Sequence, residues 1–241
     1  MISISRRSRK ANDGFTLVEL LIAVSLLSFA TLGVIAFLRQ GLKMYYMDRA
    51  RTTINRDIRS FTTQIDTDAV TANYFCIYPN FTTRSSGGTD AALVDGQAGD
   101  FLVLVYTDPS QTSQGISMIT RIVGYYREVT NTTNNTGPVH RFDTSVAGWS
   151  PAIPAAGVNI KSAAMYSILN TYVTGSASSY PIVTQLAQGL AAGTGQTTPT
   201  LFYNRLNRSI MVNAQVSESL TEIGASSETG NTYNFTISPR G

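Results

Sequence analysis

The feature that most constrains this chain is an apolar run of 24 residues, Phe15–Leu38, whose only charged side chain is Glu19. As an α-helix the run would be about 36 Å long, which is enough to cross the hydrocarbon core of a bilayer, about 30 Å thick. Because basic flanks stay on the cytoplasmic side of a membrane, we expect the N-terminus to remain inside and the rest of the chain to be exported. The basic residues that precede the run are Arg6, Arg7, Arg9 and Lys10.

The net charge of the chain is carried by the segment before Phe15. The formal charge of the whole chain is +3, and the part that follows Asp13 is neutral. Nucleic-acid-binding proteins typically present a basic surface, so the neutral part gives no indication of a nucleic-acid partner. Hydrophobic residues make up 43% of the chain and charged residues 14%, which predicts a folded domain with a polar, weakly ionic surface.

Three kinds of N-terminal segment compete to explain the apolar run. A cleaved secretory signal peptide has an apolar core of about 7–15 residues and a small-residue cleavage site, whereas this run is longer and continues into Arg39. A simple signal anchor accommodates the length but gives no role to Glu19, a carboxylate that is costly inside a membrane. The third alternative is a prepilin-type leader.

The residues Gly14–Glu19, G-F-T-L-V-E, resemble the processing signature of type IV prepilins and type II secretion pseudopilins. The resemblance covers a basic leader, a Gly, a Phe and an apolar run with Glu at its fifth position. It implies that prepilin peptidase, a membrane aspartyl peptidase, cleaves between Gly14 and Phe15 and methylates the new amine of Phe15. It also implies that Glu19 pairs with the amine of a neighbouring subunit and so sets the register of assembly.

The resemblance also implies a domain organisation and a location. Residues 1–14 would be a cleaved basic leader, and 15–38 the transmembrane and filament-core helix. Residues 39–72 would be an amphipathic continuation of that helix, and 73–241 a β-rich exported globular head. The precursor would be a single-pass protein of the bacterial inner membrane with its head in the periplasm, and assembly would move it into a periplasmic or cell-surface filament.

The helical period continues beyond Arg39. An apolar stripe follows spacings of 7, 4, 3 and 4 residues, and no proline lies between Phe15 and Thr71, so one long helix is expected. The family's fold is α+β, with a long N-terminal helix whose second half packs on a C-terminal antiparallel sheet. The stripe consists of Met47, Ile54, Ile58, Phe61 and Ile65, and we expect the last four to pack against the head.

The segment from Asn73 onward is expected to form an antiparallel sheet. Strands are predicted at 100–106, 119–129, 139–142, 209–216 and 233–237, with a hairpin turn across 131–138. A short helix is expected near 160–170 or 182–190, and 185–199 is predicted to be a loop. The segments Y-Y-R-E (125–128), H-R-F-D (140–143) and Y-N-F-T-I-S-P-R-G (233–241) resemble the larger minor pseudopilins of the J class and the W-type minor pilins.

The remaining reactive residues give little support to an enzyme. Cys76 is expected to be a small buried side chain, with a reactive thiol as the alternative, and His140 to be a surface or hydrogen-bonded residue of a strand. The chain contains no nucleophile-elbow, zinc-protease or phosphate-loop motif. No cofactor is indicated. The weak candidates for a calcium site are Asp90, Asp95 and Asp100, together with Asp66 and Asp68, although solvated or capping acids are the preferred interpretation.

The sequence therefore predicts a non-enzymatic minor pilin or pseudopilin subunit. Its expected partners are prepilin peptidase, other pilin or pseudopilin subunits and the inner membrane. Ala36 occupies a position where many major pilins have Pro, which favours a minor subunit. A type II secretion pseudopilus, a type IV pilus and a DNA-uptake filament stay open as destinations. The alternative is a membrane-anchored exported binding domain, for sugars or surface polymers, that never polymerises.

Overall fold

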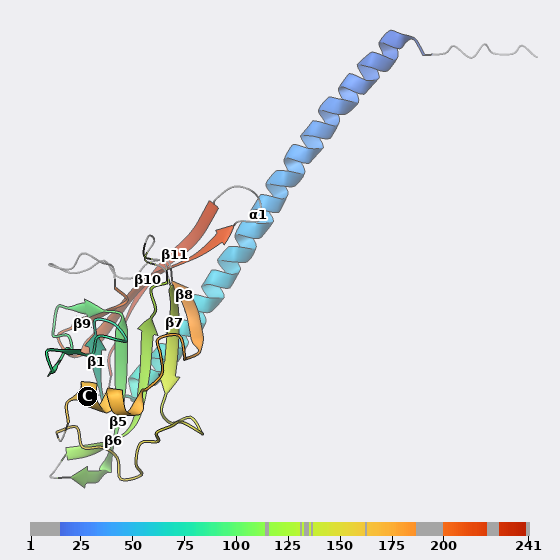
Figure 1. The fold of residues 1–241 in the computed structure, drawn as a ribbon. Coiled ribbons are helices and arrows are strands. Elements are labelled where there is room, and N and C mark those ends of the chain that lie inside the picture. Colours follow the sequence, from blue (N-terminus) through green and yellow to red (C-terminus); the bar gives the residue numbers. More distant parts are fainter. Residues whose placement is uncertain are drawn as a thin grey trace, which may run out of the picture. The chain divides into compact units, whose positions relative to one another are not determined.

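The computed structural model describes residues 15–113, 116–130, 132, 135, 137–161, 163–186, 200–220 and 227–239. By its internal contacts the chain divides into two compact units, Met1–Asp48 and Arg49–Gly241. The boundary lies within helix α1, Leu17–Thr71, which is 55 residues long (Figure 1). The last part of α1 therefore belongs to the same unit as the strands that follow it.

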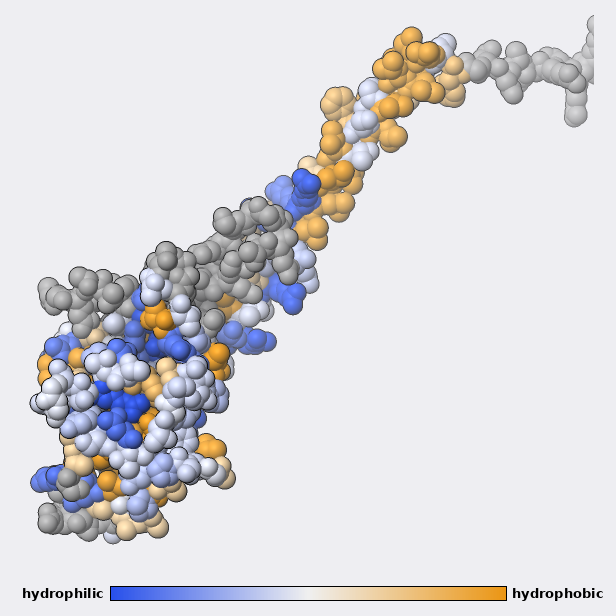
Figure 2. All heavy atoms as spheres, viewed as in Figure 1, coloured by the Kyte–Doolittle hydropathy of each residue, from blue (hydrophilic) through white to orange (hydrophobic). Residues whose placement is uncertain are grey.

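In the first unit, α1 has no described residue packed around it. Every residue from Phe15 to Tyr45 is exposed. Figure 2 shows the apolar surface of this part of α1 in orange, followed by a blue hydrophilic band further along the helix. The apolar surface is that of a segment that needs either lipid or other helices around it.

Within the described residues, the second unit contains two larger antiparallel sheets and one two-stranded ribbon. The five-stranded sheet has the order β1 (Tyr74–Tyr78), β5 (Phe101–Ser113), β6 (Ile116–Arg127), β7 (Gly137–Asp143), β8 (Ile182–Leu186). The four-stranded sheet has the order β11 (Ser227–Ile237), β10 (Ser209–Leu220), β9 (Phe202–Arg205), β4 (Ala98–Gly99). The ribbon pairs β2 (Ser85–Ser86) with β3 (Thr89–Asp90).

Strand β5 is apolar at successive positions because both of its faces are covered. Leu102, Leu104 and Tyr106 belong to the core cluster that contains the buried residues of α1 and of the four-stranded sheet. The alternate residues Phe101 and Val103 belong to a second cluster on the opposite face. Because side chains alternate across a strand, a continuous apolar run is what a strand with two buried faces requires.

The second face of the five-stranded sheet is covered by helix α2, Met165–Tyr172, and by aromatic side chains. Phe142 of β7 lies over Gly124 of the neighbouring strand, and a Cβ at Gly124 would come within 2.1 Å of the Phe142 ring. A glycine is therefore required at this position for the ring to pack. The aromatic residues of this cluster include Phe81, Tyr126, Trp149 and Tyr180.

The α+β arrangement expected from the sequence is confirmed, including a long N-terminal helix and an antiparallel sheet. The five predicted strands correspond to β5, β6, β7, β10 and β11. The strands β1, β4, β8 and β9 were not predicted. All four are five residues or shorter, and such strands carry little periodicity for a sequence pattern to reveal.

Of the two places considered for a short helix, the first is helical, and the described part of the second, Ile182–Leu186, is not. α2 lies at Met165–Tyr172, but Ile182–Leu186 is strand β8, so the helix predicted at 182–190 is wrong there. The β-branched side chains of Ile182, Val183 and Thr184 favour an extended backbone, and β8 pairs along one edge with β7. Residues 187–199 of the predicted loop lie outside the described residues.

Candidate functional site

The start of α1 is closed by a reciprocal pair of hydrogen bonds between Thr16 and Glu19. The backbone N–H of Glu19 donates to Thr16 Oγ1 at 3.3 Å, and the backbone N–H of Thr16 donates to Glu19 Oε2 at 3.0 Å. The Thr16 hydroxyl also donates to Glu19 Oε2, at 2.9 Å. This is a capping box, which satisfies N–H groups that a helix N-terminus otherwise leaves without partners.

Glu19 is therefore placed at the N-terminal end of the helix dipole, where a negative charge is favourable. The sequence T-L-V-E at 16–19 has the spacing of a capping box, a signal that the sequence analysis did not use. Phe15, the residue predicted to become the new N-terminus, lies just before the helix and is 86% exposed. Gly14 and the predicted leader lie outside the described residues.

The hydroxyl groups further along the span bond to their own helix. Ser25 donates to the carbonyl of Ile22, Ser28 to that of Val24, and Thr31 to that of Leu27, at 2.7–2.8 Å. Each hydroxyl is thus satisfied without water or a neighbouring chain. By length and composition, α1 contains a stretch that could cross a membrane.

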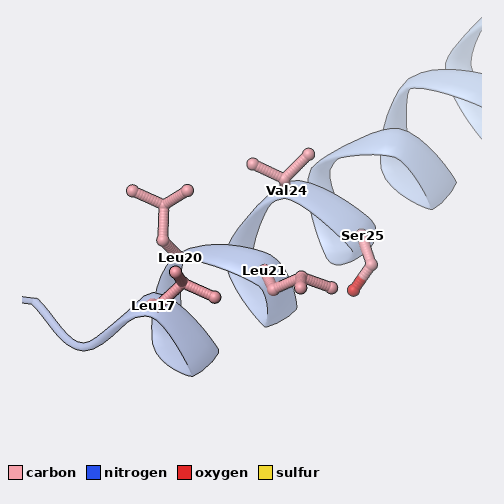
Figure 3. Close-up of a pocket in the computed structure, with 5 residues that line it drawn as sticks. All are labelled: Leu17, Leu20, Leu21, Val24 and Ser25. Carbon is pink, nitrogen blue, oxygen red and sulfur yellow. The ribbon is translucent and has the colours of Figure 1, made fainter.

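The first turns of α1 expose a continuous apolar face next to Glu19. Leu17, Leu20, Leu21 and Val24 lie on it with Ser25, and together they line a shallow, open depression on the helix surface (Figure 3). The spacing of three and four residues places these side chains above one another along the helix. A partner helix could bury them without meeting an unsatisfied polar group among the described atoms.

Residues 9–35 match the family model of the prokaryotic N-terminal methylation motif. No curated protein and no solved structure matches the chain. The matched segment includes Gly14, Phe15 and Glu19. It supports the general class of type IV pilin-like subunits, whose membrane-anchored precursors are processed by prepilin peptidase and assemble with other pilins. Subunits of this class are structural and not enzymes.

The second part of α1 presents its apolar stripe to the two larger sheets. Ile54, Phe61 and Ile65 are at most 2% exposed, and Ile58 packs against the same core cluster while partly exposed. The ring of Phe61 makes edge contacts with the rings of Tyr125 in β6 and Tyr233 in β11. The four residues that the sequence analysis assigned to helix–head packing all lie in this core.

The same face of α1 carries a buried acid, Asp68, which joins the helix to strands β6 and β7. Arg141 of β7 donates from Nε to Asp68 Oδ2 at 2.9 Å and from Nη2 to Oδ1 at 3.2 Å. Tyr125 of β6 donates its hydroxyl to Asp68 Oδ2 at 2.5 Å. A bidentate arginine–carboxylate pair with a third donor is a strong and geometrically specific arrangement.

Asp143 of β7 completes this group of charges. Arg121 of β6 binds it through Nε at 3.0 Å and Nη2 at 2.6 Å, and Arg141 Nη2 contacts it at 2.9 Å. Burial alone would raise the pKa of Asp143, but hydrogen bonds from Arg121 and Ser145 outweigh it and hold the pKa well below its usual range. We refer to Asp68, Arg121, Tyr125, Arg141 and Asp143 as the Asp68 cluster.

The pairing register of β6 with β7 brings the strand residues of the Asp68 cluster together. In the β6–β7 ladder Tyr125 lies opposite Arg141, and Val123 lies opposite Asp143, so Arg141 and Asp143 project on the face that α1 covers. Tyr125 belongs to the segment Y-Y-R-E, and Arg141 and Asp143 belong to H-R-F-D; these two segments were noted above only for a resemblance, and Arg121 precedes both. No local pattern connects these segments with Asp68, because the partners are 53 to 73 positions apart in the chain.

The carboxylates considered for a calcium site are not brought together. Asp68 is buried in its cluster and Asp66 is exposed. Asp90 accepts from the backbone N–H of Tyr166 in the first turn of α2, Asp95 accepts from Leu206, and Asp100 binds Arg127 at 2.8 Å. Among the described residues, no group of three His, Cys, Asp or Glu side chains could hold a metal ion. Asp68, Asp90, Asp95 and Asp100 have separate structural partners instead.

Cys76 and His140 also have structural surroundings. Cys76 lies in β1 and packs against the second core cluster, and burial, with a smaller contribution from the Asp90 carboxylate, raises the pKa of its thiol to about 12. A thiol with this pKa is protonated and unreactive at neutral pH. His140 is 3% exposed; its Nδ1 lies 2.5 Å from the carbonyl oxygen of Tyr180, and its ring stacks on Tyr126.

Proposed function

We propose that this chain is a minor pilin or pseudopilin, inserted in the inner membrane, cleaved between Gly14 and Phe15, and assembled into a type IV pilus or a type II secretion pseudopilus. The observation that carries the proposal is the register of the processing motif on the helix. Gly14, Phe15 and Glu19 occupy the positions that the family requires: Gly14 precedes the span, and Phe15 and Glu19 lie at the start of its exposed, apolar surface. The resemblance of the head to the J class and to W-type pilins favours a place at the filament tip.

In this proposal the role of Glu19 changes during assembly. In the structure the carboxylate bonds to Thr16 of its own helix. In the filament it would pair with the methylated amine of Phe15 of a neighbouring subunit. Two charges in an apolar bundle stabilise each other only when they meet, so a wrong axial step would leave both unpaired. Pairing between subunits therefore selects one register.

The processing step is tested by measuring the N-terminus of the mature protein by mass spectrometry. The expected species begins at Phe15 and carries one methyl group on its amine. A chain that keeps Met1, or one cut beyond residue 30, would contradict the proposal and favour the non-polymerising, membrane-anchored binding domain.

The assembly step is tested by Glu19→Gln, which removes the charge and keeps the size of the side chain. Membrane insertion should be unchanged, and incorporation into sheared or cross-linked filaments should fall about tenfold or more, because the amine of a neighbour would be left unpaired. Ser28→Ala is the matched control, since its hydroxyl bonds only to its own helix. Incorporation of Glu19→Gln at the wild-type level would show that Glu19 does not direct assembly.

A further inference from the structure

The apolar stripe of α1 determines which face of the helix meets the sheet but not where along its axis it sits. Phe61 and Ile54 are seven residues apart, as are Ile65 and Ile58. A shift of the helix by two turns would thus exchange one apolar side chain for another at these positions. Because hydrophobic contact is non-directional, such a shift would retain much of the apolar burial.

The Asp68 cluster does not tolerate the same shift. Asp68 accepts four hydrogen bonds with its carboxylate, from Arg141 Nε, Arg141 Nη2, the Tyr125 hydroxyl and, at 3.5 Å, Arg121 Nη2. Its backbone carbonyl accepts a further bond at 2.6 Å, from the hydroxyl of Tyr106 in β5. These bonds are directional and come from three adjacent strands, so they fix the position of one residue of α1 in the plane of the sheet.

No register shifted by one or two turns could replace this acid. The residues three, four and seven positions before Asp68 are Ile65, Gln64 and Phe61, and those three and four positions after it are Thr71, the last residue of α1, and Ala72; none of them is acidic. A shifted helix would leave Arg121 and Arg141 with one carboxylate, that of Asp143, in a largely buried place. Uncompensated buried charge is strongly unfavourable, so shifted registers are penalised.

The position of Asp68 is also unfavourable for the helix itself. It lies in the last turn of α1, where the helix dipole is negative and where no basic residue occurs. Asp68 therefore weakens the helix that carries it, and what it stabilises is the packing of α1 on strands β6 and β7. In some proteins a buried polar or ionic group specifies one arrangement among several of similar apolar packing.

We propose that Asp68 is a positioning residue that sets a single register of the second part of α1 on the five-stranded sheet. This register holds for the chain whether or not it assembles. Its consequence for a filament rests on the proposed function: subunits joined through α1 would have their heads placed at a defined step because Asp68 fixes each head on its helix.

The register is measured by pulsed electron–electron spin resonance on the full-length chain in detergent. Nitroxide labels are placed at Ser60→Cys on α1 and Thr120→Cys on β6, both exposed, in a Cys76→Ser background. The parent should give one narrow distance distribution. Asp68→Asn should broaden it or move it by about 5 Å, one helical turn, or more. Asp66→Asn, an exposed acid two residues away, should leave it unchanged.

A narrow, unshifted distribution for Asp68→Asn would overturn the inference, because the apolar stripe would then set the register unaided. If Asp68→Asn does not fold, the double variant Asp68→Leu, Arg141→Leu replaces the buried pair by apolar side chains and retains the Arg121–Asp143 pair. It should fold with more than one distance, and a single native distance would reject the inference. The N-terminal sequence of the mature protein tests the proposed function separately, since it does not depend on Asp68.

Discussion

Helix α1 carries two hydrogen-bonded carboxylates, Glu19 and Asp68, whose partners lie at different distances along the chain. Glu19 is bonded within its own first turn, three residues from Thr16. Asp68 is bonded to residues of β6 and β7 that are 57 and 73 positions away. The first acid stabilises the helix that carries it, whereas the second joins the helix to a sheet. Under the proposed function the Glu19 carboxylate would exchange Thr16 for the amine of a neighbouring subunit, whereas the partners of Asp68 all lie within the same chain.

The apolar side chains of the two parts of α1 also differ: those of the first part are exposed, and those of the second part pack within the chain. The aromatic ring of Phe37 is 78% exposed and that of Phe61 is fully buried. Apolar side chains in the first part of α1 are exposed and could be covered by lipid or by other helices. Those in the second part are buried against the sheets and stabilise the head. Substitutions in the two parts should therefore affect different measurements.

The largest expected effect comes from Phe61→Ala. Removing a buried aromatic ring should destabilise the second unit by about 3–5 kcal/mol, because both transfer free energy and packing are lost. Urea unfolding followed by the fluorescence of Trp149, the single tryptophan, measures this directly. Phe37→Ala is the matched control and should leave the transition in place. Equal effects of the two variants would remove the distinction between the two parts of α1.

A smaller effect is expected at acid pH. The pKa of Asp143 is lower in the folded chain than in the unfolded chain, so the stability it contributes is present above its unfolded pKa, about 3.9, and is lost as pH falls through the folded value. Stability should decrease by about 2 kcal/mol from pH 5 downward through this group. Asp143→Asn should flatten that part of the profile. If the free energy of unfolding of this variant falls below pH 5 as steeply as that of the parent, groups other than Asp143 cause the loss of stability.

The smallest expected effect is that of Thr16→Val, which removes the capping hydroxyl from the start of α1. The cost should be about 1 kcal/mol, confined to the first turn. Hydrogen exchange of the first amides of α1, measured in detergent, should be faster, while the Trp149 unfolding transition stays unchanged. Thr31→Val, whose hydroxyl bonds within the helix interior, is the comparison. Protection of the first turn equal to that of the parent would show that Thr16 does not cap α1.

Features formed by residues close together in the sequence could be predicted, and features formed by distant residues could not. The span, the processing motif and the apolar stripe are periodic or contiguous patterns, and each lies within a few helical turns. The capping of Glu19 by Thr16 is equally local and could have been predicted from its spacing. Strand β5 was recognisable because its apolar run is continuous.

The Asp68 cluster could not be predicted in this way. Arg121, Tyr125, Arg141 and Asp143 come together only through the pairing of β6 with β7, and Asp68 reaches them only when α1 packs on that pair. For Asp68 the sequence favoured a solvated or capping acid, with a calcium ligand as the weaker alternative, and a buried ion pair was not predicted. Strand β8 illustrates the same limit, because its pairing with β7 decides its conformation where a short helix was also compatible with the sequence.

Successive side chains of β5 belong to two separate core clusters, so substitutions in one cluster can be accommodated without the other. Leu102 and Leu104 face α1, whereas Phe101 and Val103 face α2 and the aromatic cluster. The strand acts as a partition, so a substitution on one side leaves the packing of the other side intact. Effects of changes in the two layers should accordingly add, as they do for sites that share no contacts. The α2 side of the head can therefore acquire new loops and surfaces while the attachment to α1 is kept.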